Sequence, residues 1–337
     1  MLKVAVIGAG VISDSHFEGW KNIPSAEVTA VVDLNEKAAK EKAEKWKIPN
    51  FVTDYKKVLS DNSIDIVDLC VPHHLHADLT IECLRANKHV ICEKPIALTI
   101  EDAERVAAAE KETDKKLMIA ENWYYIPSIA EGIKVVKEGK IGEVFSVKAN
   151  LDFDGLRSKV QKGSGSRDNS WRGEIEKSGG GILMDAGIHS ISVMRHLGGE
   201  ADSVIGLIGK SVHENREGID DLFNTLIKFK NGGTGYSHCT EASGWNMPKF
   251  DFEVLGTSGA VSIDLIKQKL VTHINEEVKE QEIQAKGGMT EELEHFVECI
   301  EKDLTPMSSS EDQIKSLKLI LAAYQSAKDK GKPVKIK

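Results

Sequence analysis

The segment from Ser178 to His189 carries the side chains best suited to chemistry. It reads SGGGILMDAGIH, with Asp185 four residues before His189. If Gly181 opens a helix, the carboxylate and the imidazole share one helical face, where they can hydrogen-bond to each other or flank one substrate. An imidazole beside a carboxylate suits general acid-base catalysis near neutral pH, because the carboxylate orients the ring and favours its protonated form. The alternative is a structural histidine and an aspartate stabilised by the helix dipole.

A second candidate site lies at the N-terminus. The apolar run Lys3–Ile7 leads directly into Gly8-Ala9-Gly10, and a helix-like stretch follows from Val11 towards Trp20. The first glycine of such a turn permits the tight bend, and the second lets the backbone approach a pyrophosphate at the helix N-terminus. The pattern indicates a dinucleotide site, although Ser13 replaces the third glycine, so an ordinary strand-to-helix turn is the alternative.

Asp33 supports the dinucleotide interpretation. It ends the predicted strand Val28–Val32, about 20 residues beyond Ser13, where an acidic residue binds the adenosine ribose. An acidic side chain at this point repels the 2′-phosphate of NADP, and the next residues, Leu34 and Asn35, include no arginine. The sequence therefore predicts NAD as the cofactor in preference to NADP.

The first half of the chain has the elements that would position these residues. Predicted strands at Ile64–Val71, His89–Cys92 and Lys116–Ala120 alternate with helices at Ala77–Asn87 and Ile100–Thr113. This alternation predicts an α/β domain with a doubly wound, mainly parallel sheet, which binds ligands at the carboxyl ends of its strands. The residues that this places around the cofactor are Gly8, Gly10, Val11, Ile12, Asp33, Leu34, Cys70, Val71, Pro72, His76, Glu93, Lys94 and Asn122.

The cluster His73-His74-Leu75-His76 raises the question of a metal site, because an HxxH spacing can place two imidazoles on one helical face. No carboxylate or cysteine with ligand spacing accompanies it. We therefore predict no metal, and we expect these residues to begin a helix beside the cofactor.

The second half changes to closely spaced strands joined by short turns such as Asn231-Gly232. It predicts an α+β domain with an open antiparallel sheet of six or seven strands, with one face covered by helices and the other a candidate subunit interface. We place the cofactor domain at 1–122 and a substrate-binding and oligomerisation domain at 123–337, with the C-terminal helix able to pack back on the first. The predicted strands are Glu143–Leu151, Ser203–Gly209, Leu222–Lys230, Gly233–Cys239, Phe250–Gly256, Ala260–Leu265 and Leu270–Asn275.

Composition excludes several classes of protein. A chain of 337 residues fits two domains, and 44 basic against 53 acidic residues give a net charge of −9, which argues against nucleic-acid binding. The five cysteines are odd in number and lack CxxC pairs, so we expect reduced thiols and a cytoplasmic location. No apolar run is long enough for a membrane span and no signal region precedes the first strand, so we expect neither a membrane nor secretion.

These motifs together resemble one family, the Gfo/Idh/MocA oxidoreductases. The resemblance covers essentially the whole chain and rests on the N-terminal glycine turn, Glu93-Lys94-Pro95, Trp171-Arg172 and the GGGxxxDxGxH pattern that ends at His189. It implies a Rossmann domain followed by an open-faced sheet, with a sugar, inositol or related polyol as substrate and a homodimer or homotetramer formed through that sheet. Lys94, Asp185 and His189 match the family's catalytic positions, and Trp171 and Arg172 match a pair that often contacts the cofactor.

Hydride transfer from a secondary alcohol requires a base for the hydroxyl proton and a donor for the developing oxygen anion. We assign the base to His189 and the donor to Lys94, and Asp185 would bind a neighbouring hydroxyl or orient the imidazole. Which of Lys94 and His189 moves the proton stays open. Trp123, Tyr125 and Arg167 are further candidates for contacts with a carbohydrate.

Three other interpretations compete with this one. Tyr324 and Lys328 have the YxxxK spacing of short-chain dehydrogenases, but they lie in the last predicted helix and such a match arises easily by chance. A non-catalytic sensor on the same fold would bind the dinucleotide and lose the lysine or histidine, and both are present. A hydride shuttle between two sugars would keep its cofactor tightly bound.

Overall fold

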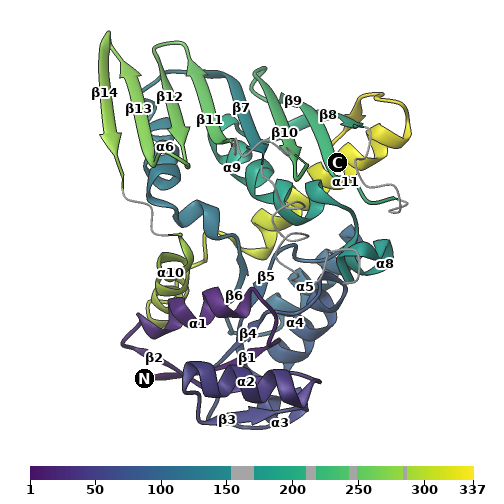
Figure 1. The fold of residues 1–337 in the computed structure, drawn as a ribbon. Coiled ribbons are helices and arrows are strands. Elements are labelled where there is room, and N and C mark those ends of the chain that lie inside the picture. The colour runs from purple at the N-terminus through teal and green to yellow at the C-terminus, as the bar shows by residue number, and fades with distance from the viewer. Residues whose placement is uncertain (153–170, 210–217, 243–248, 284–286) are drawn as a thin grey trace. The chain divides into compact units, whose positions relative to one another are not determined.

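The computed structural model describes residues 1–152, 171–209, 218–242, 249–283 and 287–337. The chain forms two compact units (Figure 1), one made of Met1–Tyr125 with Lys286–Ile314 and the other of Ile126–Ala285 with Lys315–Lys337. The described residues contain no helix long and apolar enough to cross a membrane.

The first unit is built on a six-stranded sheet in the order β3-β2-β1-β4-β5-β6, counted over its described residues. Every neighbouring pair is parallel. Helices on both faces bury these strands, which explains their continuous apolar, β-branched sequences. The result confirms the predicted doubly wound sheet. Its strands are β1 (Leu2–Ile7), β2 (Ala26–Val32), β3 (Asn50–Val52), β4 (Ile66–Leu69), β5 (His89–Glu93) and β6 (Leu117–Ala120).

The helices of this unit begin at recognisable caps. The side chain of Asn35 accepts a hydrogen bond from the Ala38 amide at the start of α2, and Thr99 caps α5 in the same way. Helix α10 comes from far along the chain, and its Phe296 is fully buried in the core that β1 and α1 line. The helices are α1 (Ser13–Lys21), α2 (Glu36–Trp46), α3 (Tyr55–Leu59), α4 (His76–Arg85), α5 (Ile100–Lys111) and α10 (Met289–Glu301), with short turns η1 (His73–Leu75) and η2 (Asn122–Tyr125).

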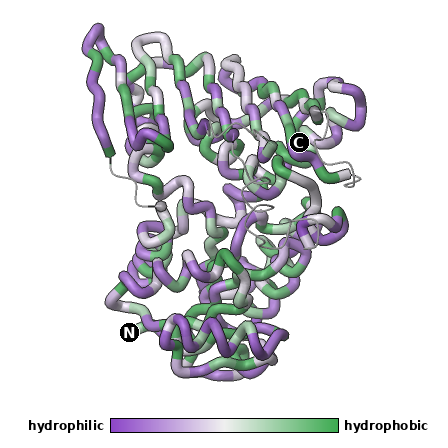
Figure 2. Tube along the Cα trace, in the orientation of Figure 1, coloured by the Kyte–Doolittle hydropathy of each residue, from purple (hydrophilic) through white to green (hydrophobic). Residues whose placement is uncertain are grey.

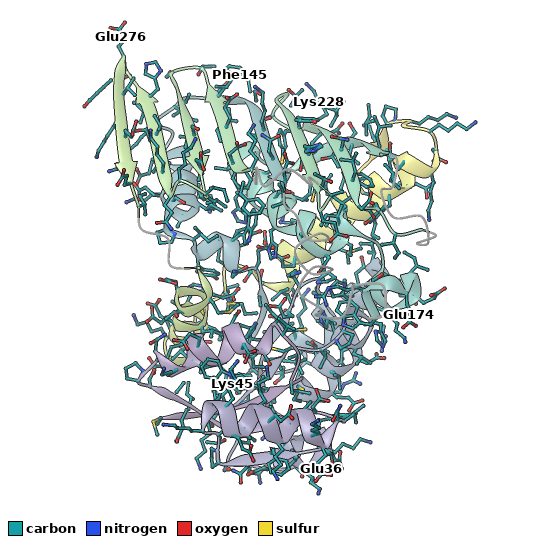
Figure 3. The ribbon with its side chains drawn as sticks, in the orientation of Figure 1. Glu36, Lys45, Phe145, Glu174, Lys228 and Glu276 are labelled. Carbon is teal, nitrogen blue, oxygen red and sulfur yellow. The ribbon has the colours of Figure 1, made fainter. Side chains whose placement is uncertain are left out.

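The second unit contains a nine-stranded sheet in the order β14-β13-β12-β11-β7-β10-β9-β8-β15 within its described residues. Figure 3 labels Phe145 and Lys228 in this sheet and Glu276 in the turn between β13 and β14. The strands are β7 (Val144–Asp152), β8 (Ala201–Ile208), β9 (Leu222–Phe229), β10 (Thr234–Thr240), β11 (Lys249–Gly256), β12 (Gly259–Asp264), β13 (Lys269–Ile274), β14 (Glu277–Glu282) and β15 (Val334–Lys335).

This sheet differs from the prediction in two respects. The central pair β7 and β10 is parallel, so the sheet is mixed, whereas all its other pairs are antiparallel. It also has two edge strands beyond the six or seven predicted. The sequence of β14 is EVKEQE, which is mostly hydrophilic (Figure 2), so it gives no apolar pattern from which a strand could be predicted. Five of its six residues are exposed. Charge on an edge strand discourages pairing with another chain.

Helices cover one face of this sheet, as predicted. They are α6 (Pro127–Lys137), α9 (Ile188–Gly198) and part of α11 (Ser310–Lys328), whose first residues belong to the other unit. Along β9, buried and more exposed residues alternate, so Phe223 and Ile227 point to the helices while Leu226 faces away. Short turns η4 (Trp171–Gly173) and η5 (Leu183–Gly187) and helix α8 (Ile175–Ser178) complete the described part.

Candidate active site

Gly8 and Gly10 form the turn after β1. Gly8 has a φ of +108°, and a Cβ there would lie 2.2 Å from the carbonyl oxygen of Cys70, so the position requires glycine. Apart from its chain neighbours, a Cβ on Gly10 would meet no atom of the described residues within 4 Å, which leaves room for a ligand to approach the backbone. Ile12, at the N-cap of α1, gives no side-chain hydrogen bond. The amides of Asp14 and Ser15 donate to the carbonyl oxygens of Val11 and Ile12, so a phosphate at this end would be bound by amides that precede them.

Asp33 follows β2 directly, and both oxygens of its carboxylate accept hydrogen bonds from backbone amides. Its carboxylate accepts hydrogen bonds from the amides of Ala9 (2.9 Å) and Asn35 (2.8 Å). Val11 and Leu34, which adjoin these motifs in the chain, are 91% and 87% exposed although both are large and apolar. A dinucleotide whose ribose binds Asp33 and whose adenine covers apolar side chains fits these residues.

His76 lies inside the first unit and connects two loops at the carboxyl edge of the sheet. Its Nδ1 lies 2.6 Å from the carbonyl oxygen of Pro95, and its Nε2 lies 2.9 Å from that of Val71. The ring is fully buried, and burial lowers the pKa of His76. The predicted contact of His76 with the cofactor stays a prediction, and the observed contacts join the loops that contain Val71, Pro72 and Lys94.

His16, from α1, bridges the ends of two central strands. Its Nδ1 lies 2.9 Å from Asp68 Oδ2 at the end of β4, and its Nε2 lies 3.0 Å from Glu93 Oε1 at the end of β5. Ionised carboxylates only accept hydrogen bonds, so the doubly protonated imidazolium satisfies both contacts. Burial alone would lower the pKa of His16, but the negative charge of Asp68 raises it well above the ordinary value. Lys94 follows Glu93 directly, so this bridge fixes the strand end from which Lys94 extends.

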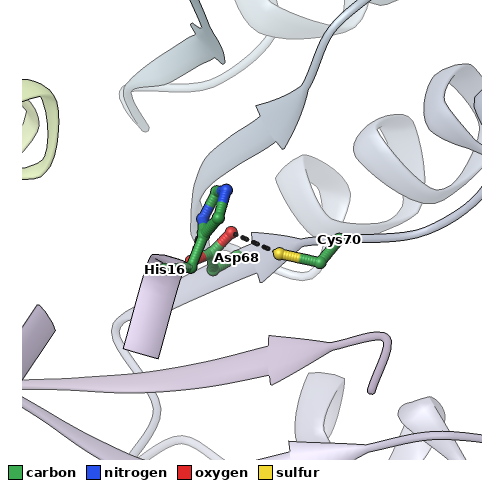
Figure 4. Close-up of side chains that lie close together, drawn as sticks. All are labelled: His16, Asp68 and Cys70. Carbon is green, nitrogen blue, oxygen red and sulfur yellow. Dashed lines mark hydrogen bonds and ion pairs between the residues drawn. The ribbon is translucent and has the colours of Figure 1, made fainter. Parts of the chain in front are cut away.

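Figure 4 shows His16, Asp68 and Cys70 together, with potential ligand atoms within 4.8 Å of one another. Hydrogen bonds already account for these atoms. Asp68 Oδ2 accepts from His16 and from Trp20 Nε1 at 2.7 Å, and the Cys70 thiol donates to Asp68 Oδ1 at 3.6 Å. Burial raises the pKa of Cys70 to about 12, so the thiol keeps its proton. A protonated thiol and imidazole are poor metal ligands, and the cluster fits a hydrogen-bonded network better.

Two further acids lie buried in the first unit, Glu121 after β6 and Glu292 on α10. Neither carboxylate oxygen of Glu292 has a hydrogen-bond partner among the described residues. Burial raises the pKa of Glu292 well above its ordinary value, and the charges of Glu93, Glu121 and Asp68 raise it further, against the opposing effect of His16. The raised pKa disfavours the charged form of Glu292, which limits the negative charge around Glu93.

In the second unit, Asp185 lies in the π-helical turn η5 and His189 in the first turn of α9. Arg172 Nε donates to Asp185 Oδ2 at 3.0 Å, and the guanidinium group lies 4.2 Å from the centre of the Trp171 ring. The structure thus joins three of the predicted residues, Trp171, Arg172 and Asp185. Asp185 is buried, so the guanidinium balances a carboxylate largely removed from water.

The backbone before Asp185 is held by a residue that the sequence analysis missed. Asp220 Oδ1 accepts from the Gly181 amide at 2.8 Å, Oδ2 accepts from the Leu183 amide at 2.9 Å, and its carbonyl oxygen accepts from the Ile182 amide at 2.7 Å. Tyr324 donates its hydroxyl to Asp220 Oδ1 at 2.7 Å. We call this arrangement the Asp220–Tyr324 cap. The sequence analysis noted Tyr324 only for its YxxxK spacing.

The structure gives individual contacts for two more of the predicted residues. Asn122 donates to the carbonyl oxygen of Gly287 at 3.0 Å, and the Tyr125 ring centre lies 5.3 Å from that of His295. Burial raises the pKa of Tyr125 well above its ordinary value. Trp123 is partly buried, and Arg167 lies outside the described residues. Substrate contacts of Trp123, Tyr125 and Arg167 stay predictions.

Comparison with known proteins covers both units. Residues 2–121 match a family model described as oxidoreductase family, NAD-binding Rossmann fold, and residues 133–336 match the C-terminal alpha/beta domain of the same family. The chain is 28% identical over 289 residues to levoglucosan dehydrogenase of Pseudarthrobacter phenanthrenivorans, covering 77% of this chain and 73% of that one. It is 25% identical over 340 residues to myo-inositol 2-dehydrogenase of Thermotoga maritima, covering 98% and 97%. A solved complex of levoglucosan dehydrogenase with NADH shares the fold, with a TM-score of 0.90, 24% identity and coverage of 100% and 99%.

The two glycines of the first turn should respond differently to substitution. We expect Gly8→Ala to lower both the melting temperature and NAD affinity, because its Cβ would clash with the Cys70 backbone. Gly10→Ala should keep the wild-type melting temperature and weaken NAD binding at least tenfold if the pyrophosphate approaches this turn, because its Cβ would enter space that the described residues leave open. Thermal unfolding and calorimetric titration with NAD measure both effects. Wild-type affinity in Gly10→Ala would contradict the assignment of the turn.

The His16 bridge predicts a pH-dependent stability. A raised folded-state pKa means that the folded protein binds the extra proton, so this contribution is complete below the unfolded value of 6.5 and is lost as pH rises through the folded pKa. We expect His16→Gln to lower the free energy of unfolding by about 3 kcal/mol at pH 6 and by less at alkaline pH. Urea unfolding across this range provides the test. The exposed His74→Gln variant is the control, and a loss that does not change with pH would exclude the imidazolium.

Proposed function

The chain belongs to the Gfo/Idh/MocA oxidoreductase family, and from this membership we propose that it oxidises a secondary hydroxyl group of a sugar, inositol or related polyol with NAD, or reduces the corresponding ketone. The family match over both halves carries the proposal, and it confirms the resemblance predicted from the sequence together with the fold class, dehydrogenase activity and NAD as cofactor. The relatives named levoglucosan dehydrogenase and myo-inositol 2-dehydrogenase support the substrate class. Such names favour a dehydrogenase over a non-catalytic sensor and over an enzyme that shuttles hydride between two sugars.

The cofactor-binding residues proposed in the first unit are those of the glycine turn and the strand ends. Gly8, Gly10 and the amides that open α1 would bind the pyrophosphate, and Asp33 would bind the adenosine ribose and disfavour a 2′-phosphate. Matches to residues 2–121 and 133–336 support an assignment of cofactor binding to 1–122 and of substrate binding to 123–337. The other proposed cofactor contacts are Val11, Ile12, Leu34, Cys70, Val71, Pro72, His76, Glu93, Lys94, Asn122, Trp171 and Arg172.

The proposed chemistry uses Lys94, Asp185 and His189. The bound nicotinamide ring supplies the acceptor for the hydride that leaves the carbinol carbon. His189 takes the hydroxyl proton as general base, and the Lys94 ammonium group donates a hydrogen bond to the oxygen as its negative charge develops. The products are the ketone, the reduced cofactor and one proton. Asp185 binds a neighbouring hydroxyl or orients the imidazole, and its ion pair with Arg172 fixes the carboxylate for either task.

The uncovered face of the second sheet supports a homodimer or homotetramer. Leu207, Leu226 and Tyr236 face away from the covering helices and are 50%, 49% and 37% exposed. Apolar side chains gathered on one sheet face are typical of an interface between subunits. The five buried free thiols also support a cytoplasmic location, where cysteines stay reduced.

The oligomer proposal predicts the mass in solution. Light scattering should give two or four times the chain mass of 37.0 kDa for the wild type. Leu226→Glu should yield monomer, because it places a charge at the centre of the proposed interface. Leu304→Glu, at a 43% exposed position in the first unit, should leave the mass unchanged. A monomeric wild type would exclude the interface.

The catalytic proposal predicts NADH formation with a member of a panel of aldoses, inositols, uronates and sugar nucleotides. Lys94→Ala should reduce kcat at least a hundredfold, because the developing oxygen anion loses its donor. Lys37→Ala, an exposed lysine on α2, should retain wild-type activity. Absorbance at the NADH band gives the rate, with NADP in parallel. Tight NAD binding without turnover of any compound would favour a sensor, and cofactor that survives dialysis would favour a hydride shuttle.

A further inference from the structure

The hydroxyl group of Tyr324 uses all of its hydrogen-bonding capacity on the segment that leads to Asp185. It donates to Asp220 Oδ1 at 2.7 Å and accepts from the amides of Gly181 and Met184, each at 3.2 Å. A phenol has one proton to donate and two lone pairs to accept, so these three contacts leave none unused. Met184 directly precedes Asp185, which brings this network next to a proposed site residue.

Asp220 binds three successive amides of the same segment, those of Gly181, Ile182 and Leu183. The first amides of a helix have no partner within the helix, and a carboxylate at this end also interacts favourably with the helix dipole. The N-cap residue of this turn, Ile182, contributes no side-chain hydrogen bond. The orientation of the first turn therefore depends on Asp220, which is 2% exposed and comes from a distant part of the chain.

The cap explains two glycines of the motif. A Cβ on Gly180 would lie 2.3 Å from the Tyr324 hydroxyl oxygen, and a Cβ on Gly181 would lie 1.9 Å from the carbonyl oxygen of Asp220. Both distances are far inside van der Waals contact. The backbone therefore needs glycine at both positions to lie against the cap, and a side chain at either would move the segment away from it.

The cap is in turn anchored to rigid elements of the second unit. The Tyr324 ring packs edge-on against Phe223 of β9, with ring centres 5.2 Å apart, and Phe223 is 1% exposed. On the same helix, the Ser326 hydroxyl accepts a hydrogen bond from the Gly206 amide of β8 at 3.0 Å. Helix α11 and the sheet therefore fix the hydroxyl of Tyr324 with respect to the segment it binds.

We propose that Asp220 and Tyr324 are positioning residues for the reaction, holding the turn that presents Asp185 and His189 in the geometry needed for proton transfer. A single π-helical turn such as η5 is rare and is frequently found at functional sites. Asp185 follows the amide bound by Tyr324 and precedes His189 by one helical turn, so a shift of this backbone displaces both side chains. This inference rests on the proposed function, because it assigns the two residues a part in that same reaction.

The experiment uses the full-length Tyr324→Phe protein. We expect kcat to fall about tenfold while the KM for NAD stays within twofold of wild type, because the cap acts on the catalytic side chains and not on the glycine turn of the first unit. Amide hydrogen exchange should become faster in a peptide spanning 181–189. Tyr55→Phe removes another hydroxyl that donates to a carboxylate, that of Glu82 at 2.9 Å, and should change neither kcat nor exchange in this peptide.

Two results would overturn the proposal. One is wild-type kcat per folded molecule in Tyr324→Phe, and the other is unchanged exchange over 181–189. A purely structural role would lower the melting temperature and leave kcat per folded molecule unaltered. If Tyr324→Phe does not fold, Asp220→Asn tests the same cap, because one of its two side-chain contacts with an amide is lost. If the wild type turns over no compound, the proposed function fails, and faster exchange in the variant still decides whether the cap holds the turn.

Discussion

The imidazolium of His16 between Asp68 and Glu93 is the interaction on which the first unit's site depends. It joins helix α1, which follows the glycine turn, to the carboxyl ends of β4 and β5, and the strand end at Glu93 carries Lys94. A single buried imidazole thus contacts two carboxylates from neighbouring strands. Helix α10 contributes Glu292, whose pKa is raised by burial, so a segment far along the chain limits the negative charge near Glu93.

In the second unit a buried side chain also bridges separate segments of the chain, but there it is an acid and not a histidine. There a buried carboxylate, Asp220, binds the amides of a helix N-terminus, and the Tyr324 hydroxyl fills the remaining contacts. In both units a residue that is not proposed to touch substrate fixes the backbone beside one that is. Directional hydrogen bonds suit this task better than apolar packing, because they specify an orientation as well as a distance.

Sequence reasoning identified most of this fold because its signals are local. Buried parallel strands appear as apolar runs, and Gly8 and Asp33 lie at spacings that a dinucleotide turn requires. The charged strand β14 and the parallel pair of β7 and β10 give no local signal, since they depend on which segments meet in space. The role of Asp220 also gives no local signal, because 39 residues separate it from the amide of Gly181 that it binds.

Tyr324 belongs to a motif that the sequence analysis set aside, and its hydroxyl is nevertheless fully hydrogen-bonded. The YxxxK interpretation required a tyrosine that touches substrate, whereas the hydroxyl contacts Asp220 and two backbone amides. Glycine motifs carry related information about their surroundings. A run of glycines indicates that something approaches the backbone closely, and the structure identifies it as the Cys70 carbonyl at Gly8 and the Asp220–Tyr324 cap at the triple glycine. The residues that contact these glycines therefore hold the backbone in place at each motif.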